Sequence, residues 1–261
     1  MAHCSGLASD TQPETAALMA FDQASAIDPR APTLIIGHRG AAGLRAENTL
    51  PSFAHALELG VAAVELDVHS VEEELVVIHD DTLERTTNAT GSVAACSLAE
   101  IRMLDAGGGA SVPLLEEVFQ LLPASVGINV ELKGADTAPR LAGFLRDHGD
   151  RDVLVSSFDH QALSVFHRAC VDVPVAPLWR RWARNVWRVA KELGAWSINL
   201  SVRIATPQRI AQAHRRGYRV LVYTVNDLEV ARRLVASKVD GVFTDYPDRI
   251  TLDSLDDPAP C

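Results

Sequence analysis

The chain has 261 residues, of which 48% are hydrophobic and 22% charged, and its formal net charge is −10. This composition is that of an ordinary soluble protein, and it excludes collagen-like, disordered and membrane-embedded chains. The negative charge repels polyanions and therefore disfavours general nucleic-acid binding. A small anionic substrate stays compatible with it if local cations or a metal ion offset the carboxylates.

Residues 1–30 are expected to form an N-terminal arm. Pro13, Pro29 and Pro32 interrupt it, and one short helix is predicted around Glu14–Gln23. The arm has no basic flank followed by an apolar run, so we expect no signal peptide. No stretch approaches the length of a membrane span, so we expect no transmembrane segment.

The four cysteines are scattered, at Cys4, Cys96, Cys170 and Cys261. Their spacing matches neither a zinc site nor a small disulfide framework. Reduced thiols and a cytoplasmic location are therefore expected.

From residue 31 to 250, short apolar runs rich in β-branched residues alternate with segments of helical periodicity, which is typical of βα units. The predicted strands are Leu34–Gly37, Ala63–Val68, Leu75–His79, Val126–Leu132, Val153–Ser156, Val173–Ala176, Trp196–Asn199, Arg219–Thr224 and Gly241–Phe243. The predicted helices include one capped by Asn48 or Thr49 and ending at Gly60, followed by Gln161–Cys170, Pro207–Arg216 and Leu228–Ala236. Eight or nine strands with helical crossovers predict a single closed (β/α)8 TIM barrel.

Two segments depart from this alternation. Residues 83–112 contain TTNATG, a weak helix near Leu98–Leu104 and three consecutive glycines, and are predicted to form a small insertion on one βα loop. Residues 251–261 are acidic, contain proline and lack periodicity, which predicts a mobile tail.

The segment Trp179–Leu193 contains four arginines that would share one face of a helix. A basic amphipathic helix with tryptophans can make weak contact with an anionic membrane surface. The alternative, which we favour, is an ordinary barrel helix with a solvated basic face.

Polar side chains end four of the apolar runs, where a (β/α)8 barrel places its working residues. They are His38 and Arg39, Glu65 and Asp67, His79, and Glu131 and Lys133. Because side chains alternate along a strand, Glu65 and Asp67 point to one face, as do Glu131 and Lys133. All are expected in the barrel mouth.

Three carboxylates at one place repel one another, and a hard divalent cation with oxygen ligands neutralises them most simply. We therefore expect Mg²⁺ or Ca²⁺ held by Glu65, Asp67 and Glu131. The alternative is an ion-pair network with Arg39 and Lys133.

The two histidines and two cations add the remaining parts of a phosphodiester site. His38 and His79 can accept and donate protons near neutral pH, and Arg39 and Lys133 can hold phosphate oxygens. Breaking a phosphodiester bond requires charge compensation, an activated hydroxyl nucleophile and protonation of the leaving alkoxide, and these residue types supply all three.

The sequence leaves the roles of several residues near this site open. Glu47 and Asn48 either reach the phosphate site or, for Asn48, cap a helix. Asp80 and Asp81 are predicted to form a turn. His69 follows the acid pair, and the sequence leaves open whether it is a functional residue or a surface residue.

Six motifs, in order, resemble the glycerophosphodiester phosphodiesterase family. Between His38 and Pro247 they read HRGAAGLRAENTLPSF, VELDVHS, VVIHDDTLERTTNATG, INVELK, YTVND and DGVFTDYP. The resemblance implies a barrel of the phosphatidylinositol-phospholipase type that hydrolyses glycerophosphodiesters to sn-glycerol 3-phosphate and an alcohol. In the family, attack by the glycerol 2-hydroxyl can give a cyclic phosphate, which water then opens.

The resemblance also assigns roles at the matching positions. It implies that His38 and His79 are the acid/base pair, in an order left open. It implies that Arg39 and Lys133 contact phosphate and that the three strand-end acids bind the metal.

The chain departs from the family pattern at Ala41, at Val71–Glu74 and at Tyr223, where the family usually has glycine, an Asp-Gly turn and tryptophan. These changes concern substrate fit more than chemistry, and Tyr223 is taken as a substrate contact. Leu178 and Trp179 follow a predicted strand and are expected to line the pocket for the alcohol.

Three other functions are alternatives to hydrolysis of soluble glycerophosphodiesters. A lysophospholipase D would use the same chemistry at a membrane. A non-catalytic barrel that serves as a binding module would be expected to lose a histidine or an acid, and none is lost. An amidohydrolase-type metalloenzyme would show His-x-His where this chain has His38-Arg39-Gly40.

Overall fold

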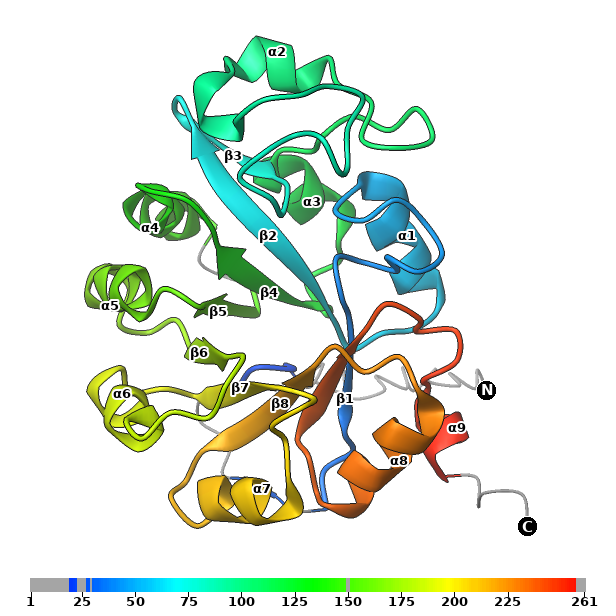
Figure 1. Cartoon of the computed structure of the whole chain (residues 1–261), viewed down its shortest axis with the longest axis vertical. Helices are drawn as coiled ribbons and strands as arrows, with labels where there is room; N and C mark the ends of the chain where they lie inside the picture. Colours follow the sequence, from blue (N-terminus) through cyan, green and yellow to red (C-terminus); the bar gives the residue numbers. More distant parts are fainter. Residues whose placement is uncertain (1–18, 23–26, 29, 149–150, 257–261) are drawn as a thin grey trace, which may run out of the picture.

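The structure, a computed structural model, describes residues 19–22, 27–28, 30–148 and 151–256. In this part of the chain eight parallel strands close into a barrel in the order β1-β9-β8-β7-β6-β5-β4-β2, with β2 pairing back to β1 (Figure 1). The barrel strands are β1 (Leu34–Gly37), β2 (Ala63–Val71), β4 (Gly127–Leu132), β5 (Val153–Ser157), β6 (Val175–Trp179), β7 (Ser197–Ser201), β8 (Arg219–Tyr223) and β9 (Gly241–Thr244). The predicted TIM barrel is confirmed.

Helices surround the barrel and bury their apolar faces against the outward-facing strand residues (Figure 1). They are α1 (Leu50–Glu58), α3 (Leu115–Leu121), α4 (Thr137–Asp147), α5 (His160–Ala169), α6 (Val186–Glu192), α7 (Pro207–His214) and α8 (Leu228–Ala236). Local sequence sets several starts: Thr49 caps α1 and Thr206 caps α7, each by accepting a backbone N–H, with proline in the first turn.

The predicted strand at residues 75–79 has a different place from the one expected. β3 (Glu74–Val77) pairs antiparallel with the far end of β2 and lies outside the closed barrel. Only Glu72 and Glu73 separate the two strands, and Glu72 adopts a φ of 54°. A parallel crossover needs a dozen or more residues, so a two-residue connection permits only a hairpin.

The hairpin leads into the segment predicted as an insertion. It contains a 3-10 helix, η1 (Val93–Ala95), and the helix α2 (Leu98–Arg102). Ser97 and Glu100 form a capping box at the N-terminus of α2, in which the side chain of each accepts the backbone N–H of the other. A separate hydrophobic cluster around Val76, Leu83 and Ile101 holds this segment together. The segment projects from one edge of the molecule, beside β2 and β3 (Figure 1).

The interior of the barrel is closed at the N-terminal ends of its strands by Phe21. Its ring is buried and packs edge-on against Trp196, with ring centroids 5.7 Å apart. The Phe21 N–H donates to Asp152 at 3.2 Å. At Gly127 a Cβ would stand 2.8 Å from the Phe21 ring, so this position leaves room only for glycine.

Two terminal expectations meet the structure in part. Residues 19–22 of the predicted N-terminal helix form a turn and not a helix, and residues 14–18 lie outside the described residues. At the other end, Leu252–Asp256 of the expected tail form the short helix α9, with Leu255 packed against the core, and residues 257–261 lie outside the described residues.

The predicted helix over Trp179–Leu193 is wrong in its first half. Residue 179 ends β6, residues 180–185 form a loop, and α6 begins only at Val186. β6 itself lies two to three residues later than predicted, because the register that pairs Leu178 with Asn199 extends the strand past Pro177. Arg180, Arg181 and Arg184 therefore share no helical face.

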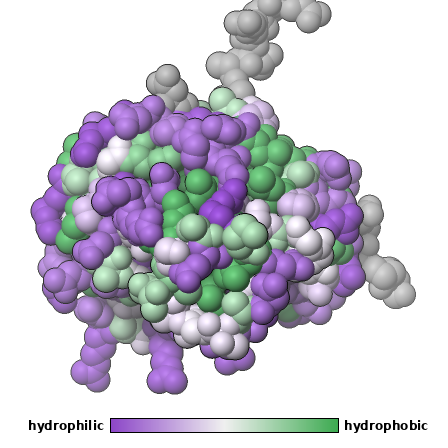
Figure 2. Space-filling view, turned by 90° about the horizontal axis from the view of Figure 1, so that it is seen from above, coloured by the Kyte–Doolittle hydropathy of each residue, from purple (hydrophilic) through white to green (hydrophobic). Residues whose placement is uncertain are grey.

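The surface seen in Figure 2 carries hydrophobic residues in small groups between hydrophilic ones. Of the helices in the described part of the chain, none combines the length and the apolar character that a membrane span requires. Cys96 and Cys170 are free thiols, while Cys4 and Cys261 lie outside the described residues.

Candidate functional site

Three acids converge where the middle of β2 pairs with the C-terminal half of β4. Glu65 and Asp67 come from β2 and Glu131 from β4, and Asp67 pairs with Glu131 in the strand register. All three are buried, and one carboxylate oxygen of each lies within 4.8 Å of the others. The alternation and pairing of the strands thus bring together the acids predicted to hold a metal ion.

Arg39 and Lys133 surround these acids. Arg39 Nε lies 3.2 Å from Asp67 Oδ2, and the Arg39 backbone N–H donates to Glu65 Oε2 at 2.9 Å. Lys133 Nζ lies 3.2 Å from Asp67 Oδ1 and 2.5 Å from Glu131 Oε1. These two oxygens are buried and have no hydrogen-bond partner of good geometry among the described residues, so each keeps a lone pair for a further ligand.

The charges at this site are incompletely compensated. Burial, together with Asp67 and Glu131, raises the pKa of Glu65 well above its usual range. Burial and the Asp67 charge raise the pKa of Glu131 to about 7. Burial would also raise the pKa of Asp67, but Lys133 and Arg39 outweigh it and lower that pKa to about 2.

These shifts describe a site with more carboxylate than its own cations can neutralise. A divalent ion with oxygen ligands would supply the missing charge, so the three acids fit such an ion.

The turn after β1 holds Arg39 in place. Arg39 and Gly40 both have positive φ, 51° and 82°. A Cβ on Gly40 would lie 2.5 Å from Ser52 Oγ, so only glycine fits there. Ser52 in turn donates to the Arg39 carbonyl at 2.8 Å, which ties the turn to α1.

His38 lies at the end of β1 with each ring nitrogen beside a carboxylate. Its Nδ1 is 2.6 Å from Asp245 Oδ1, and its Nε2 is 3.9 Å from Glu65 Oε2. Asn226 donates to the other Asp245 oxygen at 2.6 Å. The Asp245 contact orients the imidazole so that Nε2 faces the acids.

His79 reaches the same site from the hairpin. β3 runs antiparallel to β2, so the chain returns toward the barrel mouth and delivers His79 there. Its Nδ1 contacts Asp80, which Arg85 also binds, and its carbonyl accepts from His69 Nε2 at 3.3 Å. Burial lowers the pKa of His79, which favours the neutral ring.

A cavity of about 260 Å³ opens between the two histidines. One wall of the cavity includes His38, Arg39, His79, Glu65 and Glu131. The wall formed by the ends of β5, β6 and β8 includes Phe158, Leu178, Arg180 and Tyr223. The Tyr223 hydroxyl is buried and has no hydrogen-bond partner among the described residues. Tyr223 and Leu178 both line this cavity, and their contact with substrate stays a prediction.

Trp179 lies elsewhere. It is buried, its ring centroid is 4.4 Å from that of His160, and it belongs to the core between strands and helices. Side chains alternate along β6, so Leu178 and Arg180 face the cavity and Trp179 faces outward. The expectation that Trp179 lines the pocket does not agree with this geometry.

Several site residues were missed or read differently from sequence. Asp245 and Asn226 lie in the motifs DGVFTDYP and YTVND, whose position after β9 and β8 was the available signal. Asp80, predicted as a turn former, contacts His79. Asn48 leaves capping to Thr49 and instead donates to Asp67 Oδ2 at 2.9 Å.

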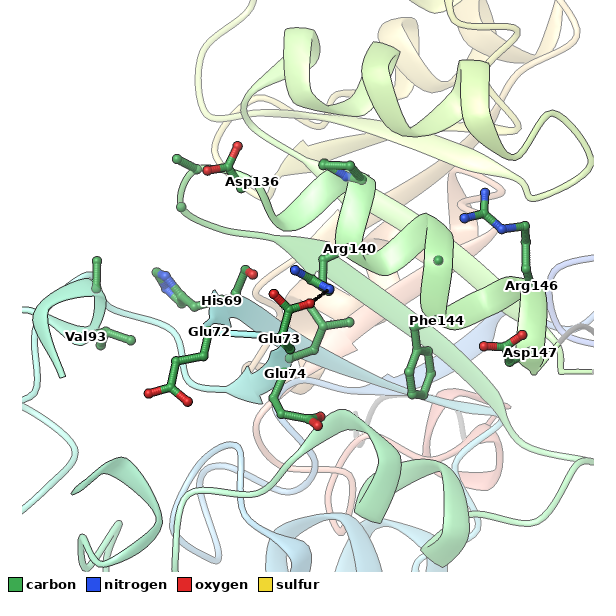
Figure 3. A pocket seen from close by; sticks show the side chains of 17 residues that line it. His69, Glu72, Glu73, Glu74, Val93, Asp136, Arg140, Phe144, Arg146 and Asp147 are labelled. Atoms are coloured by element: carbon green, nitrogen blue, oxygen red, sulfur yellow. Dashed lines mark hydrogen bonds and ion pairs between the residues drawn. The ribbon is translucent and has the colours of Figure 1, made fainter. Parts of the chain in front are cut away.

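A larger hollow, of about 880 Å³, lies between the β2–β3 hairpin and α4. Figure 3 shows Glu72, Glu73 and Glu74 on the hairpin side and Arg140 and Phe144 on the α4 side, with Glu73 and Arg140 joined by an ion pair. None of the nine residues predicted for the site lines this hollow. The predicted chemistry therefore converges at the barrel mouth and not in the larger space.

The chain matches proteins of known family along most of its length. The model of the glycerophosphoryl diester phosphodiesterase family matches residues 38–249. A glycerophosphodiester phosphodiesterase of Caldanaerobacter subterraneus is 31% identical over 233 residues, covering 84% of this chain and 96% of the relative. One from Bacillus altitudinis is 34% identical over 236 residues, covering 83% and 96%.

Solved structures agree with this match. A phosphodiesterase of Oleispira antarctica, solved with the product sn-glycerol-3-phosphate, superposes with a TM-score of 0.82 at 28% identity, covering 87% of this chain and 98% of that one. Together with the barrel and the six motifs, these matches show that the chain belongs to the glycerophosphoryl diester phosphodiesterase family and is a phosphoric diester hydrolase.

Proposed function

We propose that this protein hydrolyses glycerophosphodiesters to sn-glycerol 3-phosphate and an alcohol, with His38 and His79 as the acid/base pair. One observation carries the proposal: both imidazoles line one cavity, and each has its Nδ1 beside a carboxylate. An imidazole held this way presents Nε2 to a reacting group. One ring accepts the proton of the attacking glycerol 2-hydroxyl, and the other protonates the departing alkoxide, which leaves a cyclic phosphate. Water then opens this ring with the two proton transfers reversed and gives sn-glycerol 3-phosphate.

Glu65, Asp67 and Glu131 are proposed to hold one divalent cation, Mg²⁺ or Ca²⁺. Their proximity, the raised pKa values of Glu65 and Glu131 and the free lone pairs of two oxygens support this. When bound, the ion supplies positive charge for the phosphoryl oxygens.

Arg39 and Lys133 are proposed to bind the phosphate. Their side chains now pair with Asp67, Glu47 and Glu131, so they already lie beside the carboxylates at the cavity. Burial alone would lower the pKa of Lys133, but the charges of Asp67 and Glu131 outweigh burial. The pKa is therefore raised, and the amine stays charged. Phosphate oxygens would replace part of this carboxylate contact, and the metal would take up the released carboxylate charge.

The lysophospholipase D alternative loses the feature that suggested it, because the basic residues 180–184 do not form a membrane-surface helix. Hydrolysis of soluble diesters is therefore the function we propose.

A coupled assay for glycerol 3-phosphate over a panel of diesters, with and without EDTA, tests this function. Wild-type activity is expected to disappear in EDTA and return with Mg²⁺ or Ca²⁺, and Glu65→Ala is expected to be inactive with either ion. Activity that survives the chelator would remove the metal from the proposal. Full activity in His38→Ala would remove the acid/base assignment, and a wild-type protein inactive on every diester would contradict the function itself.

A further inference from the structure

The two walls of the mouth cavity differ in charge. Both carboxylates that line it, Glu65 and Glu131, are on the wall of the proposed metal site. The wall at the ends of β5, β6 and β8, which we call the distal wall, includes Phe158, Leu178, Arg180 and Tyr223, and none of its residues that line the cavity is an acid. A phosphate bound near the three acids would leave one of its two substituents facing this distal wall.

Arg180 lies on the distal wall without an acidic partner. Its guanidinium carbon is 4.4 Å from the Phe158 ring centroid, and Lys133 Nζ lies 5.8 Å from the same ring. Among the described residues Arg180 forms no ion pair within 4 Å. A lone aromatic ring would attract a quaternary ammonium group, but here a protein cation already occupies the ring face.

Tyr223 adds a second donor to this wall. Its ring packs edge-on against Phe158, with centroids 5.8 Å apart, and its buried hydroxyl has no partner in the described structure. Burial and the Glu131 charge raise the pKa of this phenol, while the Arg180 charge opposes them, so the hydroxyl keeps its proton at neutral pH. A buried donor without an acceptor favours a ligand that brings one.

The sequence around the distal wall reinforces its positive charge. Arg181 and Arg184 follow Arg180 closely in the chain, and residues 173–191 contain no acid, in a chain whose net charge is −10. Arg181 and Arg184 are exposed on the loop that follows β6, which also carries Arg180. The local field therefore opposes the overall charge of the protein.

We propose that the distal wall selects diesters whose leaving alcohol carries an anionic group, such as a second phosphate, over diesters of quaternary ammonium alcohols. This inference rests on the proposed function, since it assigns the substrate class of the same site. Arg180 attracts the anionic group and repels an ammonium, and the Tyr223 hydroxyl donates to its oxygens.

The test compares kcat/KM for three diesters of glycerol 3-phosphate: the choline ester, the glycerol ester, and the glycerol ester with a terminal phosphate. Arg180→Gln is expected to lower the ratio of the phosphorylated to the choline ester about five- to tenfold at low salt, the effect of one partly screened charge. Arg180→Glu is expected to reverse the preference. Arg184→Gln, on the same loop but not lining the cavity, is the matched control.

The outcomes separate this inference from the function it rests on. Wild type and Arg184→Gln should hydrolyse the glycerol ester, whose leaving alcohol is uncharged, within about threefold of each other. Measurable hydrolysis of this ester by Arg180→Gln shows that the catalytic machinery is intact in that variant. If it is hydrolysed but the ratio does not change in Arg180→Gln, or changes equally in Arg184→Gln, the distal wall does not select by charge. A ratio unaffected by 0.5 M KCl would also overturn the inference, because a charge effect of this kind is screened. Failure to hydrolyse any of the three esters would instead contradict the proposed function.

Discussion

The two ends of this barrel are built on the same eight strands but show opposite chemistry. At the C-terminal ends, buried acids crowd together, two of their pKa values are raised, and two carboxylate oxygens lack good hydrogen bonds. At the N-terminal ends, Phe21 and Trp196 fill the interior with apolar surface, and the Phe21 N–H is hydrogen-bonded to Asp152. Buried like charges at the C-terminal ends are unfavourable for stability and belong to the candidate site, while apolar packing closes the core at the N-terminal ends.

This contrast implies a division of mutational effects. Changes at the mouth should alter activity with little loss of stability, and changes at the plugged end should do the reverse. Four measurements test the division, from the largest expected effect to the smallest.

The largest effect is expected for His38→Ala. Loss of one acid/base group should lower kcat/KM about 10³-fold, with the midpoint of thermal unfolding nearly unchanged. His55→Ala is the control, since His55 lies on α1 outside the cavity and its ring contacts the exposed Glu58. A large fall in thermal stability in His38→Ala would show that this residue supports the fold and would blur the division.

Phe21→Ala should have the opposite profile. Removing this buried ring leaves a cavity at the closed end of the barrel and should lower the free energy of unfolding by about 3 kcal/mol. The kcat of the remaining folded protein should stay within about twofold of wild type. Denaturant unfolding measures the loss, and Met19→Ala, where half of the side chain is exposed, should cost less than about 0.5 kcal/mol. An equal loss in both variants would mean that Phe21 does not close the core.

Asp245→Asn tests a positioning residue at the mouth. Burial alone would raise the pKa of Asp245, but the hydrogen bond from His38 outweighs burial. The pKa is therefore lowered, and the carboxylate is charged beside the ring. The amide keeps the shape but loses the charge, and kcat should fall about 10- to 100-fold while KM changes little. Asp248→Asn on the exposed turn nearby should leave kcat unchanged. A rise in KM with constant kcat would place Asp245 in substrate binding instead.

The smallest effect concerns stability at the mouth without metal. The folded-state pKa of Glu65 is raised above its unfolded value, so in EDTA this group costs stability that grows as pH rises from about 4.5 toward the folded pKa. Glu65→Gln removes the titration and keeps an acceptor for the Arg39 N–H, so it should be more stable than wild type by about 1 kcal/mol at pH 8 and by less at pH 5. Thermal unfolding in EDTA at both pH values measures this, with exposed Glu58→Gln as the control. A gain that is equal at both pH values would contradict the charge argument.

Much of the candidate site could be predicted because it depends on local patterns. The polar residues after β1, β2 and β4 end apolar runs, and strand alternation alone places Glu65 with Asp67. The hairpin was misread because LVVI has the same apolar pattern in a barrel strand as in an antiparallel partner. Only the two-residue connection through Glu72 and Glu73 distinguishes them.

Partners distant in the chain could not be predicted in this way. The contact of Asp245 with His38 joins residues 207 positions apart and exists only because β9 pairs with β1 to close the barrel. The outward position of Trp179 was equally hidden, because a shift of one residue in the assigned strand moves a side chain from the cavity to the helix layer.

The sequence by itself determined the barrel, the family and the residue types at the mouth, because apolar periodicity and strand-end chemistry are local properties of the chain. Tertiary structure alone decided which carboxylate orients each histidine, that the N-terminal arm closes the barrel through Phe21, and that Arg180 and Tyr223, which have no acidic partner among the described residues, line the same cavity as the acids. The physical reason is that these contacts depend on strand order and register around a closed sheet, which bring together residues that no local pattern connects.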